Sequence, residues 1–184
     1  LNAGQILNLS SISRDIGVAV NTLRRWLSVL EASYLIFLLH PFHKNFGKRM
    51  IRSPKIYFYD TGLLTSFLGI NSEKGWEESL LYGAIFENYI ISEVKKGILH
   101  KGSMDHLYFL RTSHGEEVDL IMESVHGIRY LEIKASFTYK PQFHKTLNKI
   151  LSAGDKGLVV YRGRTLEIDQ NLRVVNYAEF LEDA

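Results

Sequence analysis

The sequence predicts an α/β protein in two parts, a winged helix-turn-helix followed by a domain with a mixed sheet. Residues 1–70 carry eight Lys or Arg against three Asp or Glu, a net charge of +5, whereas residues 71–184 carry fourteen against seventeen, a net charge of −3. A short helix, a glycine and a longer helix occur early, and the later segments follow the order α-β-β-β-α-β. The uneven charge favours two modules, with an anionic partner for the first.

The overall composition is that of an ordinary globular protein, with 46% hydrophobic and 23% charged residues among 184. The absence of cysteine excludes disulfides, thiolate metal sites and a cysteine nucleophile. No apolar run is long enough to cross a bilayer and no secretion signal is present, so we expect a cytoplasmic protein. Because the chain begins with Leu1 rather than methionine, we expect it to be a piece of a longer protein.

The first part has the pattern of a helix-turn-helix. Ser10 or Ser11 is expected to cap a short helix, Gly17 interrupts the pattern, and a longer helix then repeats apolar residues at helical spacing. In this motif the start of the second helix faces the major groove of DNA. The side chains expected to contact DNA are Asn21, Thr22, Arg24 and Arg25.

A basic loop follows the second helix. Two β-like runs, 34–39 and 55–59, flank HPFHKNFGKRMIRSP, which contains no acid. Two such strands after a helix-turn-helix would form a wing whose positive loop follows phosphates. The loop residues expected to bind DNA are Lys44, Lys48 and Arg49. Alternatively, the loop is solvated or faces an acidic domain, and the winged helix docks a protein.

The second part is expected at residues 79–184, after a short capped helix at 60–70 and a linker at 71–78. An amphipathic helix over residues 79–96 opens it. The remaining elements are expected as strands at 106–110, 117–122 and 128–135, a helix at 141–151, strands at 157–161 and 173–175, and a short terminal helix.

Charged residues alternate with apolar ones along two of these strands. Val118, Leu120 and Met122 are expected on one face, which leaves Glu117 and Asp119 on the other. In the next strand, Glu132 and Lys134 share a face. If the two strands pair, Asp119, Glu132 and Lys134 converge.

Such a convergence has a chemical use. Two carboxylates can bind Mg²⁺, which prefers oxygen ligands and retains water. The metal lowers the pKa of a bound water and neutralises charge on a scissile phosphate, and a nearby ammonium can orient the attacking water. The alternative is a solvated charged face with one cross-strand ion pair.

With Asp119 and the Glu132-Ile133-Lys134 run, the order α-β-β-β-α-β resembles the PD-(D/E)XK nuclease superfamily. Its members have a restriction-endonuclease-like fold and cut DNA phosphodiesters with Mg²⁺. The resemblance implies that Glu87, in GAIFENYIISE on the first core helix, joins Asp119 and Glu132 as a metal ligand and catalytic acid, with Lys134 as the catalytic lysine. The proline that commonly precedes the first acid is replaced by Val118, and Glu116 and Glu117 leave open which acid faces the site.

A narrower resemblance covers nearly all 184 residues. The segments IGVAVNTLRRWLSVLEASYLI, KRMIRSPKIYFYDTGLL, GAIFENYIISEV, YFLRTSHGEEVDLIM and YLEIKAS are together similar to the uncharacterised C-terminal region of bacterial and archaeal AAA-type ATPases. This resemblance implies a winged helix and a nuclease-like domain behind an ATP-hydrolysing motor. Since no G-x-x-x-x-G-K-[ST] phosphate loop occurs here, the motor and its ATP are expected upstream.

Three functions remain open from the sequence. The first is a DNA-directed region of an AAA-type ATPase with a Mg²⁺-dependent endonuclease site. The second is a non-catalytic module that binds nucleic acid or protein and regulates the ATPase, and the third is a structural or oligomer-forming region with a vestigial site. The seven histidines lack the spacing of metal ligands, so no histidine metal site is expected.

Overall fold

A single eight-stranded mixed sheet forms the centre of the molecule in the computed structural model, which describes residues 3–42, 51–113, 115–152 and 154–183. Its strands are β1 (Ile36–Pro41), β2 (Lys55–Phe58), β3 (His106–Arg111), β4 (Glu117–Ser124), β5 (Gly127–Lys134), β6 (Lys156–Tyr161), β7 (Leu166–Glu167) and β8 (Leu172–Asn176). Their spatial order is β2-β1-β3-β4-β5-β6-β8-β7. The β3-β4-β5 meander is antiparallel, whereas β5, β6 and β8 are parallel, which confirms a mixed sheet.

Helices lie on both faces of this sheet. They are α1 (Leu9–Ile16), α2 (Val20–Ala32), α3 (Thr61–Phe67), α4 (Glu73–Glu77), α5 (Tyr82–Lys101), the 3-10 helix η1 (Pro141–His144), α6 (Leu147–Ile150) and α7 (Tyr177–Asp183). Helices α5 and α7 pack on one face, and η1 and α6 pack on the other. None of the helices in the described part of the chain is long and apolar enough to cross a membrane.

Two apolar cores hold the layers together. In the first, Phe86 and Ile90 of α5 pack against Leu131 of β5, and each of these residues is at most 2% exposed. In the second, Leu147 of α6 packs against Tyr130 and other residues on the opposite face of the sheet. Since complete burial of one such side chain stabilises the fold by about 2 kcal/mol, the first core fixes α5 and the second core fixes α6 against β5.

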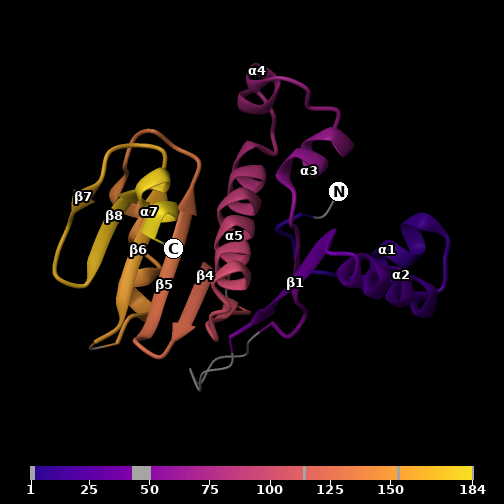
Figure 1. The fold of residues 1–184 in the computed structure, drawn as a ribbon, viewed down its shortest axis with the longest axis horizontal. Coiled ribbons are helices and arrows are strands. Elements are labelled where there is room, and N and C mark those ends of the chain that lie inside the picture. Colours follow the sequence, from indigo (N-terminus) through magenta and orange to yellow (C-terminus); the bar gives the residue numbers. More distant parts are fainter. Residues whose placement is uncertain (1–2, 43–50, 114, 153, 184) are drawn as a thin grey trace.

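Helix α5 is the central element of the fold (Figure 1). It is expected at 79–96 and is found at Tyr82–Lys101, and it ends at Gly102, whose left-handed φ of 60° closes the last turn. Asn88, fully buried on α5, bonds the backbone N–H and carbonyl of Phe58 through its side chain and also donates to Thr61. These bonds tie α5 to the end of β2 and thereby position the residue next to Asn88, Glu87.

The first two helices are confirmed, but the cap of α1 differs from the prediction. Asn8, rather than Ser10 or Ser11, is the N-cap, because its side-chain oxygen accepts the backbone N–H of Ser11. Gly17 ends α1 with a left-handed φ of 70°. Helices α1 and α2 project from one side of the molecule (Figure 1).

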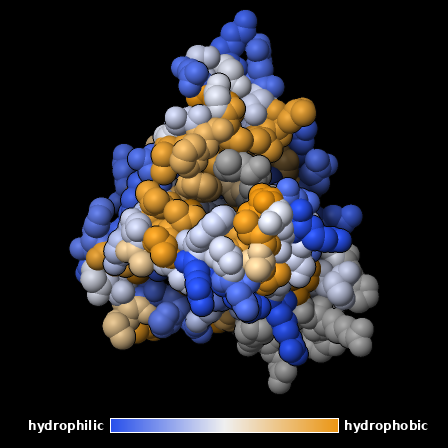
Figure 2. Space-filling view, turned by 90° about the vertical axis from the view of Figure 1, so that its right-hand side faces the viewer, coloured by the Kyte–Doolittle hydropathy of each residue, from blue (hydrophilic) through white to orange (hydrophobic). Residues whose placement is uncertain are grey.

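Few side chains of this helix pair are buried. Helix α1 has no buried residue, and Leu23 is the buried residue of α2. Ile16, Trp26 and Val29 are 50%, 50% and 62% exposed. Figure 2, which faces this side, shows apolar patches among polar ones. The helix pair therefore presents apolar surface to its surroundings.

The two strands expected to flank a wing are present, and they are part of the central sheet. β1 pairs antiparallel with β2 and continues into a short parallel pairing with β3 through His40 and Pro41. Tyr57 of β2 joins the same core as Phe86 of α5. The segment expected as a linker, 71–78, contains the short helix α4, and the segment expected as one helix at 141–151 forms η1 and α6.

Candidate functional site

Charged side chains from α5, β4 and β5 gather near the start of β4. The structure brings three of the predicted residues, Asp119, Glu132 and Lys134, into direct contact. Glu87 lies close enough to Asp119 for the two charges to interact, but its bonds run to Lys55 and Tyr57 of β2. The site therefore has two linked halves.

A β-bulge in β4 sets the direction of Asp119. The pairing of β3 with β4 shifts between Tyr108 and Leu110, so that β4 contains an extra residue at this point. Val118 consequently packs in the core under α6, whereas Leu120 packs in the core under α5. The expectation that Val118 and Leu120 share a face is wrong, because the bulge changes the alternation.

Asp119 is held where the pairing of β4 with β5 ends. The register runs from Ser124 and Gly127 up to Leu120 and Leu131. Beyond that pair, the Oδ2 atom of Asp119 accepts the backbone N–H of Ile133 at 2.7 Å and a hydrogen bond from Lys134 Nζ at 3.1 Å. Because the carboxylate replaces a strand carbonyl as the acceptor, its position is fixed by the backbone of β5.

Glu132 and Lys134 complete the first half of the site. Lys134 Nζ donates to Glu132 Oε2 at 2.6 Å, and Glu132 is only 5% exposed. Burial, together with the charge of Asp119, raises the pKa of Glu132 to about 8. Burial alone would lower the pKa of Lys134, but the charges of Asp119 and Glu132 raise it above its ordinary value.

Lys55 is the centre of the second half. Although Lys55 is a lysine in a strand, it is 1% exposed, and its Nζ lies 3.1 Å from Glu87 Oε1 and 2.6 Å from Glu117 Oε1. The hydroxyl of Tyr57 donates to Glu87 at 2.6 Å, and Arg111 pairs with Glu117 at 3.3 Å. Burial and the charge of Asp119 raise the pKa of Glu87, an effect that Lys55 opposes.

Sequence reasoning missed Lys55 and Tyr57 as members of this cluster, and it left open whether Glu117 faces the site. The one available signal was a lysine in the otherwise apolar run KIYFY, where an unpaired charge would be costly to bury. Its partners come from α5 and β4, which are far from β2 in the sequence. The alternation within one strand does not reveal such partners.

The donor set can be compared with the Mg²⁺ that the sequence resemblance implies. Across the described residues, no group of three or more His, Asp or Glu side chains is arranged to hold a metal ion. The Lys134 ammonium bridges two carboxylate groups, and Glu132 Oε1 is buried with no hydrogen-bond partner in the described part of the chain. Two carboxylates, Asp119 and Glu132, the second of which has an oxygen without a hydrogen-bond partner, suit a divalent cation that keeps water as its other ligands.

The residues predicted to contact DNA lie on the projecting helix α2. Asn21, Arg24 and Arg25 are exposed, and Thr22 is partly exposed. Arg24 donates to the side chain of Asn21 at 3.4 Å, which places these two groups side by side. The predicted loop contacts, Lys44, Lys48 and Arg49, lie outside the described residues.

The fold and site define a mixed α/β domain with a carboxylate–lysine cluster beside the ends of two paired strands. Residues 82–180 match the family described as Domain of unknown function (DUF4143), and the chain belongs to this family. Residues 1–74 match a second family, described as Domain of unknown function (DUF8612). The two matches meet near α4.

Two mycobacterial proteins are similar to this chain. They are the Uncharacterized protein Rv2008c of Mycobacterium tuberculosis and the Uncharacterized protein Mb2031c of Mycobacterium bovis, each 34% identical over 149 residues. The match covers 80% of this chain and 32% of each relative, so the chain spans about a third of the length of these relatives. No solved structure matches the chain.

Proposed function

We propose that this chain is the DNA-directed region of an AAA-type ATPase and carries a Mg²⁺-dependent phosphodiesterase site. The observation that carries the proposal is the bridging of Asp119 and Glu132 by Lys134 on paired strands, beside the buried, unpaired oxygen of Glu132. The element order α5-β3-β4-β5-α6-β6 supports a nuclease-like fold. The ATPase motor, and with it a cytoplasmic location, are parts of the proposal that follow from the sequence resemblance.

The side chains of the site have distinct roles in such a reaction. A bound Mg²⁺ would supply charge neutralisation at the phosphate and a more acidic water. Asp119 and Glu132 would hold it, and the N–H of Ile133 keeps the Asp119 carboxylate in place. Lys134 is within reach of both carboxylates and would orient the attacking water. Glu87, held by Lys55 and Tyr57, would keep negative charge near the cation.

Cleavage of supercoiled plasmid DNA in the presence of Mg²⁺ or Mn²⁺ tests this proposal. We expect wild-type protein to nick or linearise the plasmid and Asp119→Asn to abolish the activity, because the amide removes the charge that holds the cation. Lys134→Met is expected to reduce the rate by about a hundredfold or more, the range for loss of a group that positions or moves a proton.

Matched control variants are available on β4 and on β6, away from the site. Glu123→Gln removes a carboxylate from the far end of β4, and Lys156→Met removes an exposed lysine from the start of β6. Both should cleave like wild type. Equal cleavage by wild type and by Asp119→Asn would refute the catalytic assignment, because the activity would then belong to a contaminant or to another site.

Helix α2 is the expected grip on duplex DNA. Replacing both Arg24 and Arg25 by alanine should weaken duplex binding and lower the slope of log affinity against log salt concentration by about 2, because each phosphate contact contributes about 0.9. Fluorescence anisotropy of a labelled duplex across a salt series measures this slope. Arg173→Ala, an exposed arginine on β8, is the control and should leave the slope unchanged; an unchanged slope in the double variant would exclude α2 from the interface.

A non-catalytic interaction module is the second candidate, and a different observation favours it. Lys55 already forms ion pairs with Glu87 and Glu117, while the projecting helix pair exposes Ile16, Trp26 and Val29. Such a pairing stabilises the fold without any reaction, and exposed apolar residues suit contact with a partner. This function predicts DNA or protein binding without cleavage in the plasmid assay.

A further inference from the structure

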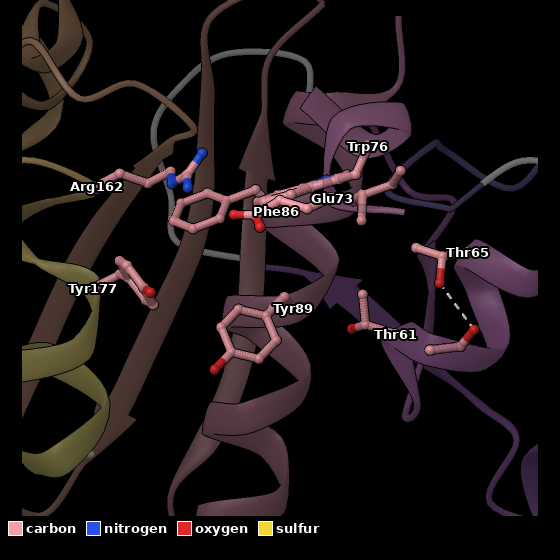
Figure 3. A pocket seen from close by; sticks show the side chains of 10 residues that line it. Thr61, Thr65, Glu73, Trp76, Phe86, Tyr89, Arg162 and Tyr177 are labelled. Atoms are coloured by element: carbon pink, nitrogen blue, oxygen red, sulfur yellow. Dashed lines mark hydrogen bonds between the residues drawn. The ribbon is translucent and has the colours of Figure 1, made fainter. Parts of the chain in front are cut away.

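An aromatic pocket lies between α3, α4, α5, α7 and the end of β6. Its volume is about 370 Å³, within the range of small-molecule sites. Trp76 of α4, Phe86 and Tyr89 of α5 and Tyr177 of α7 supply rings from three helices, and Thr61 adds a hydroxyl (Figure 3). Rings from so many separate elements form a surface suited to a flat ligand.

Arg162 provides the positive charge of this pocket. Its side chain is 12% exposed, and its guanidinium lies 5.0 Å from the ring centre of Trp76 and 4.0 Å from that of Phe137. It bonds the hydroxyl of Tyr82 and lies 3.5 Å from Glu77. Because aromatic rings hold the guanidinium in a fixed plane, Arg162 can itself serve as a stacking surface.

Trp76 adds an unsatisfied donor to the pocket wall. Its indole N–H is buried and has no hydrogen-bond acceptor among the residues that the structure describes. A buried donor without a partner is uncommon in folded proteins and is costly. A ligand that carries a ring carbonyl or ring nitrogen would supply the acceptor.

The pocket and the Asp119–Glu132–Lys134 cluster both lie near the carboxyl ends of the parallel strands. In the parallel strands, Lys134 of β5 is in register with Tyr161 of β6, which precedes Arg162. Tyr161 is in turn in register with Asn176 of β8, which precedes Tyr177. Neighbouring strands lie about 4.8 Å apart, so the ends of β5 and β8 are separated by a distance comparable with the size of a nucleotide.

Two further connections join the pocket to the cluster. The backbone N–H of Arg162 donates to the carbonyl of Ser136, two residues after Lys134, at 3.0 Å. On α5, Phe86 lines the pocket and the next residue, Glu87, belongs to the site. The pocket lies on the α5 face of the sheet, whereas Glu132 and Lys134 alternate to the face covered by α6, so a ligand that reaches both must cross the end of β5.

We propose that this pocket takes an unstacked nucleobase from a single nucleic-acid strand whose phosphate lies at the Asp119–Glu132–Lys134 cluster. The identification of the strand rests on the proposed function. Bases that leave the stack are bound by stacking on aromatic rings and arginine planes and by hydrogen bonds to their edges. The rings, Arg162 and the donor of Trp76 supply these contacts, and the end of β5 supplies the path for the backbone.

Tryptophan fluorescence offers a direct test, because the chain contains two tryptophans, Trp26 and Trp76. In a Trp26→Phe parent, Trp76 is the single emitter. A short oligodeoxyadenylate is titrated in the presence of a chelator, so that no cation-dependent cleavage occurs. We expect it to quench Trp76, and an oligonucleotide of equal length with abasic sites to bind about tenfold more weakly, the usual effect of losing one stacked base.

Variants of the parent separate the pocket from general electrostatic binding. Tyr177→Leu and Arg162→Gln are each expected to remove the preference for the base-containing strand. Phe67→Leu, which changes an exposed ring of α3 outside the pocket, should keep it. Tyr89→Leu is a second ring variant, used if circular dichroism shows that Tyr177→Leu unfolds.

Three results would each overturn the inference. The first is equal affinity for the two oligonucleotides, and the second is a preference for the base-containing strand that survives in the pocket variants. The third is quenching of Trp76 by a phenylalanine-containing peptide in place of the oligonucleotide. The outcome of the plasmid cleavage assay is independent of the outcome of this binding assay. Base-dependent binding without plasmid cleavage would reject the phosphodiesterase and retain the pocket. Plasmid cleavage without base-dependent binding would do the reverse.

Discussion

Replacing Lys55 by methionine is expected to lower the free energy of unfolding at pH 7 by about 3 kcal/mol. Lys55 is 1% exposed and pairs with two carboxylates, Glu87 at 3.1 Å and Glu117 at 2.6 Å. Removing one partner of a buried ion pair leaves the other charge without compensation, which is far more costly than the net worth of the pair. Methionine keeps the length of the side chain, so little of the loss comes from a cavity.

Chemical denaturation followed by circular dichroism measures this loss. The matched control is Lys74→Met, because Lys74 also pairs with a glutamate, Glu78, at 3.8 Å, but its side chain is 83% exposed. An exposed pair of this kind contributes at most about 0.5 kcal/mol. If Lys55→Met were no more destabilising than Lys74→Met, then Tyr57 and Arg111 would suffice to hold Glu87 and Glu117. The charge of Lys55 would then not be required for stability.

Local patterns in the sequence predicted much of the fold. The apolar repeat of α5 and the alternation of β5 arise within single elements, so Glu132 and Lys134 could be placed on one face from their spacing alone. Helix α3 could be predicted in the same way, since its N-cap, Asp60, bonds a backbone N–H only a few residues further along the chain. Features of this kind depend on neighbours along the chain.

Other features depend on contacts between distant segments and could not be predicted. The bulge in β4 is a property of its pairing with β3, and it redirected Val118 away from the expected face. The joining of β1 to β3 made the expected wing strands part of the central sheet. The partners of Lys55 and the rings around Arg162 likewise come from elements separated by tens of residues. Periodicity within one segment contains no information about such pairings.

The second large effect concerns Glu132 and the pH dependence of stability. Burial raises the pKa of this carboxyl from 4.5 to about 8 in the folded protein. A raised acid pKa means that folding favours the protonated form, so its contribution to stability is complete below pH 4.5 and is lost as the pH rises towards 8. Since one pKa unit corresponds to about 1.4 kcal/mol, the wild-type protein loses roughly 5 kcal/mol over this window because of Glu132.

Glu132→Gln should remove this loss, because glutamine resembles the protonated carboxyl and does not ionise. We therefore expect the variant to be similar to wild type at pH 4.5 and more stable than wild type by several kcal/mol at pH 9, as measured by chemical denaturation at both pH values. Glu78→Gln is the control, since that carboxylate is 68% exposed and its surface pair contributes little at either pH.

The sign of this comparison separates the two views of the cluster. If the role of Glu132 were to stabilise the fold through its ion pair with Lys134, the Glu132→Gln variant would be less stable than wild type at pH 9. The buried, unpaired Oε1 atom argues for the opposite result, because the fold carries the cost of a carboxylate that it has not fully satisfied. A costly group retained beside Asp119 and Lys134 is what a binding or catalytic role requires, whereas a purely structural cluster would lose stability when Glu132 is replaced.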